Sequence, residues 1–554
     1  MGFISSPTTT PKFTLPHKTG TIIQLRTSRM KQMRALAITT GIYKIPTTAI
    51  LWCSSTGLQD DEHDLTFHGG FDKAVHQYFP GHYPEWRSEF PEGSGFEEGG
   101  FGENIVCMPG EGQWKMNENT VCIGDIYQIG EEGRGAILQV SLPRQPCFKL
   151  NHRFRIKGFA PHTWKLSRTG WYYRVLKEGW MQVGDSMTLS QRPHPTWPIE
   201  RIQEYLHRNK TDPEKLRELE KIEEFGDECK GAFPRMIANL TTKNKEPEAW
   251  RDFRCTQMNN ESARIKSFVF QATETDGPIN KNGPGFVSLK LPNGLRRSYS
   301  VVSSTSNTIT LGVALAEPSR GGSKWLHQEL KLGDVISMSK ITGVAEINGQ
   351  ASNHVFIVGG IGVTAFLEHV NIYNQINFNY DFHYAVRSKD DIPFREKIEG
   401  MGERVTIYDS AKGERMDVER ILRNRLWNSQ VYVCGPDKLI EEVQSCQREL
   451  RMKQEEIHYE AFQADGTGDA FEAELKKSGK ILEVDGQKTL LETMREAGYD
   501  IDSSCETGSC GTCRVEVCSG NVEHRGTSLT EDDKKDGGML PCVSRGVGRL
   551  VIDW

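Results

Sequence analysis

The chain has 554 residues, of which 37% are hydrophobic, 9% aromatic and 26% charged, and its mean hydropathy is −0.53. At about 100–200 residues per domain this length predicts three to five domains, and the apolar content excludes a wholly disordered chain. The formal net charge of −6 argues against general affinity for nucleic acid. No apolar run approaches the about 18 residues of a membrane span, and the longest, residues 354–367, is interrupted by glycines.

The first 59 residues are basic, with seven lysines and arginines and no acidic residue. This start is similar in composition to a mitochondrial transit peptide, and residues 1–6 fit the loose myristoylation pattern. The stretch soon becomes strand-like, however, which favours its being part of a fold. Thirteen cysteines are too few for a disulfide scaffold and indicate a reducing compartment. We therefore expect a cytoplasmic location, with a mitochondrial one left open.

Residues 1–197 are predicted as one domain, in which short strands are separated by Gly/Pro turns. A helical tail is predicted over residues 198–245. The first helix keeps one apolar face, made of Ile199, Ile202 and Leu206. Asp212 followed by Pro213 is an N-cap and first-turn pair that opens a second helix.

A series of short motifs indicates the family of this first part. They are Phe67-His68-Gly69-Gly70-Phe71, Phe101-Gly102-Glu103-Asn104, Gly124-Asp125, Pro143-Arg144-Gln145-Pro146-Cys147, Thr169-Gly170-Trp171-Tyr172 and Gly184-Asp185. In this order they resemble a MOSC domain, a β-barrel-like fold. With the helical tail, the sequence is most similar to the bacterial MOSC group that reduces N-hydroxylated purines.

The resemblance implies that Cys147 is the catalytic residue and binds molybdenum carried by a molybdopterin. A soft thiolate is a sensible ligand for such a metal. Arg144 and Lys149, together with Lys73 and Arg174, would neutralise the phosphate of the cofactor. The alternative is that Cys147 is a buried structural cysteine.

Two details of this resemblance stay open. His68 and Asn104 are either pocket residues or turn stabilisers. Where the family often has the pattern GLxGD, this chain has Gly57-Leu58-Gln59-Asp60-Asp61. A side chain thus replaces a turn glycine, which puts the conformation of this loop in doubt.

Residues 250–350 are predicted as a small antiparallel β-barrel, because residues 264–340 are rich in strands without convincing helices. One strand carries Arg297-Ser298-Tyr299-Ser300. A later loop, SRGGSKWLH at residues 319–327, contains Gly321, Gly322 and Ser323.

Residues 351–462 alternate strands with helices, the pattern of a parallel α/β sheet. Strands are predicted at residues 354–358, 381–386, 404–408 and 430–433. The first runs into Gly359-Gly360-Ile361-Gly362-Val363-Thr364, where glycines would let a pyrophosphate approach the backbone, although tight turns also use glycine. Cys434-Gly435-Pro436 follows the last strand.

The Arg297–Ser300 strand, the Gly359–Thr364 turn and the Cys434–Pro436 turn, in this order, resemble the ferredoxin–NADP reductase superfamily. The resemblance implies that Arg297 meets the flavin phosphate, that Tyr299 lies on the isoalloxazine ring, and that Ser300 sits near its reactive nitrogen. The loop of Gly321, Gly322 and Ser323 would donate N–H or hydroxyl groups to the flavin phosphate. Thr364 and the Cys434-Gly435 turn would line the nicotinamide.

A linker is predicted at residues 463–471 from the segment QADGTGD, and a last domain at residues 472–554. Strands are predicted at residues 480–484, 512–517 and 550–553, with a helix near Leu490. Four cysteines, Cys505, Cys510, Cys513 and Cys542, have the spacing C-x4-C-x2-C-x28-C. Four thiolates at this spacing suit a [2Fe–2S] cluster; a zinc site or free thiols are the alternatives. This part resembles a plant-type ferredoxin, a β-grasp fold, and Cys518 is predicted in its core.

Flavin barrel, nucleotide domain and C-terminal ferredoxin, in that order, resemble the phthalate dioxygenase reductase family. The resemblance favours FMN over FAD and NADH over NADPH, while Arg387 after the second parallel strand keeps NADPH open.

The module order predicts an enzyme in which electrons pass from NAD(P)H to flavin, to [2Fe–2S] and to molybdenum. We expect a self-sufficient oxidoreductase that reduces small N-hydroxylated substrates. The first alternative is a reductase that donates electrons to a separate oxygenase, with the MOSC part as a docking or cofactor-binding module. The second is a molybdenum-cofactor carrier or sulfur-transfer protein.

Overall fold

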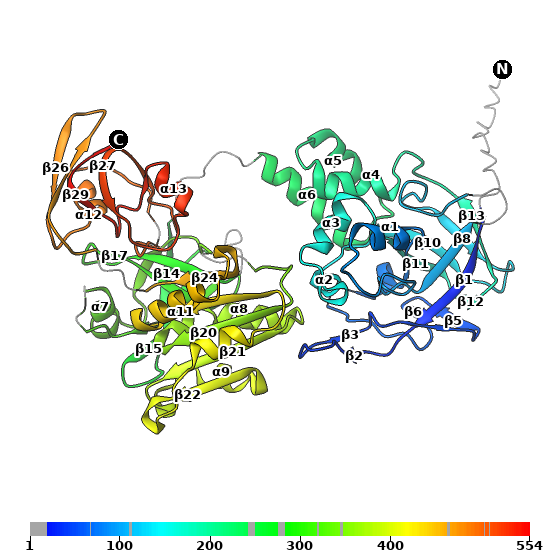
Figure 1. Ribbon diagram of the computed structural model, residues 1–554, viewed down its shortest axis with the longest axis horizontal. Coiled ribbons are helices and arrows are strands. Elements are labelled where there is room, and N and C mark those ends of the chain that lie inside the picture. Colours follow the sequence, from blue (N-terminus) through cyan, green and yellow to red (C-terminus); the bar gives the residue numbers. More distant parts are fainter. Residues whose placement is uncertain are drawn as a thin grey trace, which may run out of the picture. The chain divides into compact units, whose positions relative to one another are not determined.

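We analysed a computed structural model of the chain, which forms two compact units, Met1–Lys245 (unit 1) and Glu246–Trp554 (unit 2) (Figure 1). It describes residues 19–66, 68–109, 114–241, 250–274, 283–317, 319, 321–343, 347–462, 466–503, 505–508 and 510–554. The myristoylation pattern, and the start of the transit-like stretch, lie outside these residues.

Unit 1 is built around a sheet in the order β13-β9-β10-β11-β7-β8-β1-β4, in which β13 also pairs with β1 and so closes a seven-stranded barrel. The strands are β1 (Thr19–Thr27), β4 (Ile45–Thr47), β7 (Val75–Gln77), β8 (Ile105–Pro109), β9 (Ile126–Ile129), β10 (Ile137–Pro143), β11 (Trp171–Lys177) and β13 (Ser186–Gln191). A smaller sheet joins β12 (Gly179–Met181), β5 (Leu51–Ser54) and β6 (Gly57–Leu58), and β2 (Lys31–Gln32) pairs with β3 (Thr39–Thr40).

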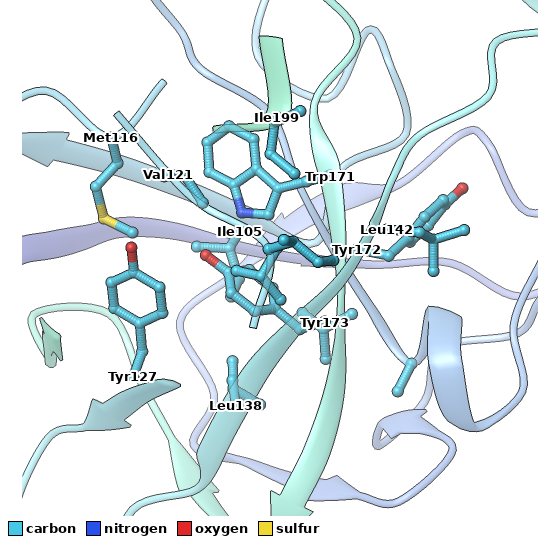
Figure 2. Packing of buried hydrophobic residues seen from close by; sticks show 14 of the residues in the cluster. Ile105, Met116, Val121, Tyr127, Leu138, Leu142, Trp171, Tyr172, Tyr173 and Ile199 are labelled. Atoms are coloured by element: carbon cyan, nitrogen blue, oxygen red, sulfur yellow. The ribbon is translucent and has the colours of Figure 1, made fainter. Parts of the chain in front are cut away.

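The helices of unit 1 are α1 (His82–Glu89), α2 (Phe148–Phe154), α3 (Phe159–Lys165), α4 (Ile199–Gln203), α5 (Pro213–Glu220) and α6 (Asp227–Thr241), with a π-helical turn η2 (Glu204–Arg208) after α4 and a 3₁₀ turn η1 (Phe71–Lys73). The predicted cap is confirmed, because the Asp212 carboxylate accepts the backbone N–H groups of Glu214 and Lys215. The tail shares the barrel core: Ile199 packs in one buried cluster with Trp171 and Tyr173 of β11 (Figure 2). Each such fully buried side chain contributes about 1.5–3 kcal/mol to stability.

Unit 2 begins with a closed antiparallel barrel in the order β14-β15-β18-β17-β16-β19. Its elements are β14 (Arg251–Asn260), β15 (Ile265–Ala272), β16 (Phe286–Lys290), β17 (Arg296–Ser304), β18 (Thr308–Ala314), α7 (Gly322–Gln328) and β19 (Val335–Met338).

A five-stranded parallel sheet follows, in the order β22-β21-β20-β23-β24. Its strands are β20 (Asn353–Gly359), β21 (Tyr380–Val386), β22 (Val405–Asp409), β23 (Ser429–Cys434) and β24 (Ile457–Glu460), and its helices are α8 (Leu367–Gln375), α9 (Arg395–Glu399), α10 (Val418–Arg423) and α11 (Asp437–Glu449). Every residue of β20 is buried, as expected for a central strand covered on both faces. A 3₁₀ turn, η3 (Gly360–Ala365), separates β20 from α8.

The last part is a mixed sheet in the order β26-β25-β29-β27-β28, in which β25 and β29 are parallel. Its elements are β25 (Phe471–Leu475), β26 (Lys480–Val484), α12 (Leu490–Glu496), β27 (Val515–Glu523), α13 (Glu531–Lys535), β28 (Gly538–Met539) and β29 (Arg545–Ile552). Thr489 and Glu492 form a capping box at the start of α12. In the described part of the chain, no helix is long and apolar enough to cross a membrane.

The fold class predicted from the sequence is confirmed, with several local corrections. Strand β25, which begins at Phe471 inside the predicted linker, was not predicted, and β29 begins at Arg545 rather than at residue 550. Residues 264–340 do contain a helix, α7, which is only two turns long and buries one apolar side chain, Leu326. Strand β24 was not predicted, and β27 begins at Val515 rather than at residue 512. Cys518 is exposed instead of lying in the core, and the Lys476 ammonium lies 3.5 Å from its sulfur.

Candidate functional site

The predicted flavin motif lies on β17, opposite the start of α7. Gly322 allows this approach, because a Cβ added there would lie 2.5 Å from Cγ of Arg297 and 3.0 Å from the Tyr299 hydroxyl. Strand alternation places Ser298 and Ser300 on the opposite face from Arg297 and Tyr299. The Ser298 hydroxyl bonds to Ser288 of β16 at 2.9 Å, and Ser300 is buried.

The phosphate-loop residues are ordered by local hydrogen bonds. The Gly321 N–H donates to the Ser319 hydroxyl at 3.2 Å, and Ser323 accepts the N–H of Ala316 at 3.2 Å. The structure therefore brings the loop together with Arg297 and Tyr299, as the motifs predict for a flavin phosphate.

The two predicted nucleotide turns pack directly on one another. A Cβ added at Gly362 would lie 2.4 Å from the carbonyl oxygen of Cys434, and one at Gly359 would lie 2.7 Å from Cδ of Pro436. A Cβ added at Gly435 would lie 3.0 Å from the backbone nitrogen of Gly359. Glycine at these positions therefore allows the two turns to pack against each other.

Thr364 and Cys434 lie deeper in the same region, and both are buried. The Thr364 hydroxyl donates to the Ile361 carbonyl at 2.9 Å, and burial raises the pKa of the Cys434 thiol well above its usual range. Glu460, which the sequence analysis missed, pairs with Cys434 in the register of β23 and β24. Burial and the neighbouring Cys505 raise the pKa of Glu460 to about 8. Glu460 lies at the end of a four-residue strand that was not predicted, and no local sequence pattern indicates a buried carboxyl there.

The four predicted cluster ligands form two pairs. The backbone N–H of Cys505 lies 3.4 Å from the sulfur of Cys510, and the sulfurs of Cys513 and Cys542 are 3.3 Å apart. Hydrogen bonds within each pair lower the pKa of Cys510 to about 6 and lower the pKa of Cys513. Two thiol pairs fit two irons with two protein ligands each.

Unit 1 contains a partly open cavity of about 50 Å³, and Cys147 is one of the residues that line it. Cys147 is half-buried and directly precedes α2. The cationic residues of the lining are Lys44, Arg144 and Lys149, and its neutral polar and aromatic residues include His63, His68, His76, Phe101 and Tyr172.

Arg144 has an unsatisfied buried nitrogen. Lys149 pairs with Asp64 and Lys44 pairs with Asp61, so both ammonium groups are neutralised by protein carboxylates. Arg144 is only 3% exposed, and its Nη1 has no hydrogen-bond partner among the described residues. A buried guanidinium nitrogen without a partner is costly, so this end of the cavity suits an anionic ligand such as a phosphate.

The histidines of the cavity are neutral. Burial and the charges of Arg144 and Lys149 hold the pKa of His68 well below its usual range, and burial does the same for His76. Nδ1 of His68 lies 2.9 Å from the hydroxyl of Tyr172, whose pKa burial raises to about 12. His68 is thus a residue of the cavity lining.

Asn104 also lines the cavity, but its side chain is fully engaged by the fold. It accepts the His76 N–H at 3.0 Å and donates to the Arg26 carbonyl and the Asp61 carboxylate. Asp60, which replaces the family's glycine, has φ +62°, the left-handed conformation that glycine favours. The loop therefore keeps the backbone shape that a glycine would give it.

Two of the four predicted phosphate-binding cations, Lys73 and Arg174, are not among the residues that line the cavity. Lys73 forms an ion pair with Glu228, and Arg174 binds Asp72 with N–O distances of 2.6 and 3.0 Å. Instead, the helical tail holds the cysteine loop: Gln203 donates to the Arg144 carbonyl at 3.2 Å and to the Thr169 hydroxyl at 3.0 Å. This role of the tail was not predicted.

Comparison with known proteins finds related families and relatives. Residues 64–188 match the MOSC domain family, and residues 473–546 match the 2Fe-2S iron-sulfur cluster binding domain family. The solved structure of phthalate dioxygenase reductase is 25% identical and covers 55% of this chain and 98% of its own, with a TM-score of 0.46. The heme-dependent oxidative N-demethylase beta subunit of Ectopseudomonas mendocina is 32% identical over 304 residues, 54% of this chain and 97% of that protein.

These modules define the protein as an NAD(P)H-dependent iron–sulfur flavoprotein oxidoreductase fused to a MOSC domain. The chain is 33% identical over 583 residues, 99% of each sequence, to a reductase of Gibberella moniliformis. It belongs to the same family as this reductase.

Proposed function

We propose that the chain is a self-contained, molybdenum-dependent reductase of N-hydroxylated compounds. The observation that supports this most directly is the cavity of unit 1, which is lined by a half-buried thiol and by a buried guanidinium whose Nη1 has no hydrogen-bond partner among the described residues. We propose Cys147 as the metal ligand and Arg144 as the main group facing the cofactor phosphate. Lys149, whose ammonium also pairs with Asp64, is proposed beside it. We also propose the flavin, nucleotide and cluster residues named above in the roles that their motifs imply.

Reduction of an N-hydroxylated substrate consumes two electrons and two protons: R–NHOH + NAD(P)H + H⁺ gives R–NH₂ + NAD(P)⁺ + H₂O. The N–O bond breaks, its oxygen leaves as water, and an N–H bond replaces it. A molybdenum centre, when bound, supplies two-electron chemistry at the N–O bond. The chain provides a soft thiolate from Cys147 and an anion-binding guanidinium from Arg144. The neutral histidines add no positive charge, so a bound anion would balance the charge of Arg144.

Metal analysis tests this proposal. The protein, made in a host with intact molybdopterin synthesis, should contain about one molybdenum per two irons, the ratio of one metal site to one [2Fe–2S] cluster. Cys147→Ser should lose molybdenum and the reduction of hydroxylated substrates, yet keep flavin, iron and NAD(P)H-dependent cytochrome c reduction. Cys518→Ser, which changes an exposed cysteine outside the cavity, is the matched control. Iron and flavin without molybdenum in the parent protein would refute the proposal.

A second candidate function is electron donation to a separate oxygenase. It is supported by the similarity of about half the chain to nearly the whole of the oxidative N-demethylase beta subunit. In that case unit 1 would be a docking or cofactor-binding module. Cys147→Ser would then support the physiological reaction as well as the parent protein does.

A further inference from the structure

Unit 2 contains an ordered contact between the flavin barrel and the parallel sheet that the function described above does not use. Glu261 lies in the turn between β14 and β15 of the barrel. Its carboxylate accepts the backbone N–H of Phe394, which directly precedes α9 of the nucleotide part, at 2.9 Å. The Ser267 hydroxyl donates to the other carboxylate oxygen at 2.7 Å, so the acceptor is itself held in place.

Phe394 has an unusual backbone. Its φ of +52° and ψ of +42° are left-handed, a conformation that bulky residues rarely adopt. Such strain persists only where surrounding contacts impose it, and it concentrates at functional positions. The hydrogen bond that the Phe394 N–H donates to Glu261 is one of these contacts.

The Phe394 ring fills a notch in the barrel. A Cβ added at Gly312 of β18 would lie 2.8 Å from the ring and 2.7 Å from Cγ2 of Thr364. Gly312 thus lets the barrel touch both Phe394 and the turn proposed to line the nicotinamide. Any side chain at this position would push the nucleotide part away from the barrel.

A carboxylate of the nucleotide part also lies against the barrel. Glu368 of α8 is buried and lies beside the backbone of Ser304 on β17. The hydrogen bond between Glu261 and the Phe394 N–H, which is charge-assisted, fixes position more strictly than apolar contacts, which tolerate sliding.

We propose that Glu261 is a positioning residue for hydride transfer: by holding Phe394 in the Gly312 notch, it sets the distance and orientation between the bound nicotinamide and the bound flavin. Hydride transfer requires the reacting atoms in near contact, so a displacement of about 1 Å is enough to slow it strongly. Binding of the nucleotide and of the flavin uses other residues and is expected to survive loss of the contact.

Amide hydrogen exchange of the full-length protein, measured without nucleotide, tests the contact itself. In Glu261→Ala, the Phe394 amide should exchange at least about tenfold faster than in the parent, because it loses its acceptor. In Glu261→Gln, where the amide oxygen still accepts, exchange should stay within about threefold of the parent.

Anaerobic stopped-flow reduction by NADH tests the positioning role. Glu261→Ala should lower the limiting rate of flavin reduction about tenfold, with flavin content unchanged and the half-saturating NADH concentration within about twofold. Glu261→Gln should restore most of the rate. Glu329→Ala, which removes an exposed carboxylate of the same barrel, should change nothing.

Gly312→Ala disturbs the contact between Phe394 and the barrel while leaving Glu261 in place. It is the variant to measure if Glu261→Ala does not fold. It should lower the limiting rate in the same way. If either variant retains flavin and reduces it at the parent rate, the proposal is overturned. Faster amide exchange in Glu261→Ala without slower flavin reduction would likewise overturn the proposal, because Glu261 would then have a structural role only.

Discussion

Arg545 offers the sharpest test of how the cluster-binding part is held together. It is 1% exposed, and its guanidinium donates to four backbone carbonyls rather than to a carboxylate: those of Gly466 and Lys488 at 2.8 Å, Asp469 at 2.6 Å and Asp485 at 3.1 Å. Arg545→Met roughly keeps the volume but removes the donor of four part-buried hydrogen bonds. In the parent protein, the cost of desolvating the guanidinium, several kcal/mol, offsets part of the stabilisation by these hydrogen bonds. We therefore expect the substitution to lower the free energy of unfolding by about 3–5 kcal/mol.

For a domain of this size, about 4–8 °C are lost per kcal/mol, so the cluster should be released at least about 12 °C earlier on heating. Visible absorbance follows the cluster, while flavin fluorescence reports the barrel separately. Arg549→Met is the control, because Arg549 lies on the same strand and makes only exposed pairs with Glu472 and Glu474, worth about 1 kcal/mol or less. Release of the cluster at the parent temperature, or an equal fall for the flavin, would refute the reasoning.

Three further predictions concern unit 1, each checked by its unfolding transition. Asp60→Gly relieves a left-handed backbone and loses only the exposed Arg29 pair, so stability should stay level or rise by up to about 1 kcal/mol; a fall in melting temperature would contradict this. Gln203→Leu leaves the Arg144 carbonyl without its donor and should cost about 2 kcal/mol in urea unfolding, and an unchanged midpoint would show that the tail does not hold the cysteine loop. Burial, together with the Lys44 charge, lowers the pKa of His63 from 6.5 to about 4. The unfolded chain therefore takes up a proton first, and the parent should lose up to about 3 kcal/mol as the pH falls from 6.5 to 4, a loss that His63→Gln should lack.

The motifs that could be predicted are those whose chemistry is local in the sequence. The four cysteines, the glycine turn after β20 and the Arg297–Ser300 strand are each contained in a short stretch or a fixed spacing, and the structure brings their members together. Strand and helix periodicity similarly predicted the parallel sheet. Short elements such as α7 and β24 escaped because a few residues carry too little periodic signal.

The cavity of unit 1 could be predicted only in part, because its lining comes from distant stretches. Cys147 and Arg144 share one motif, but Lys44 and His76 come from elsewhere and carry no signature of their own. Lys73 and Arg174 were predicted to face the cofactor on charge alone. Both charges are satisfied by nearby carboxylates, which no sequence pattern reveals.

Two contacts inside unit 2, between the barrel and the parallel sheet and between the linker and the cluster-binding part, are made by charged side chains that bond to backbone groups. Besides Arg545, Arg525 also holds the linker, because it donates to the Thr467 carbonyl at 2.7 Å. Residues predicted as a linker are thus hydrogen-bonded to the cluster-binding part. Glu261 makes the corresponding contact between barrel and sheet. Hydride transfer fails unless two atoms nearly touch, whereas single-electron transfer to a cluster tolerates a larger gap. Substitution at the Glu261 contact should therefore be tolerated far less well than substitution in the linker. Loss of the Glu261 hydrogen bond should slow flavin reduction more than loss of the Arg525 hydrogen bond slows reduction of the cluster.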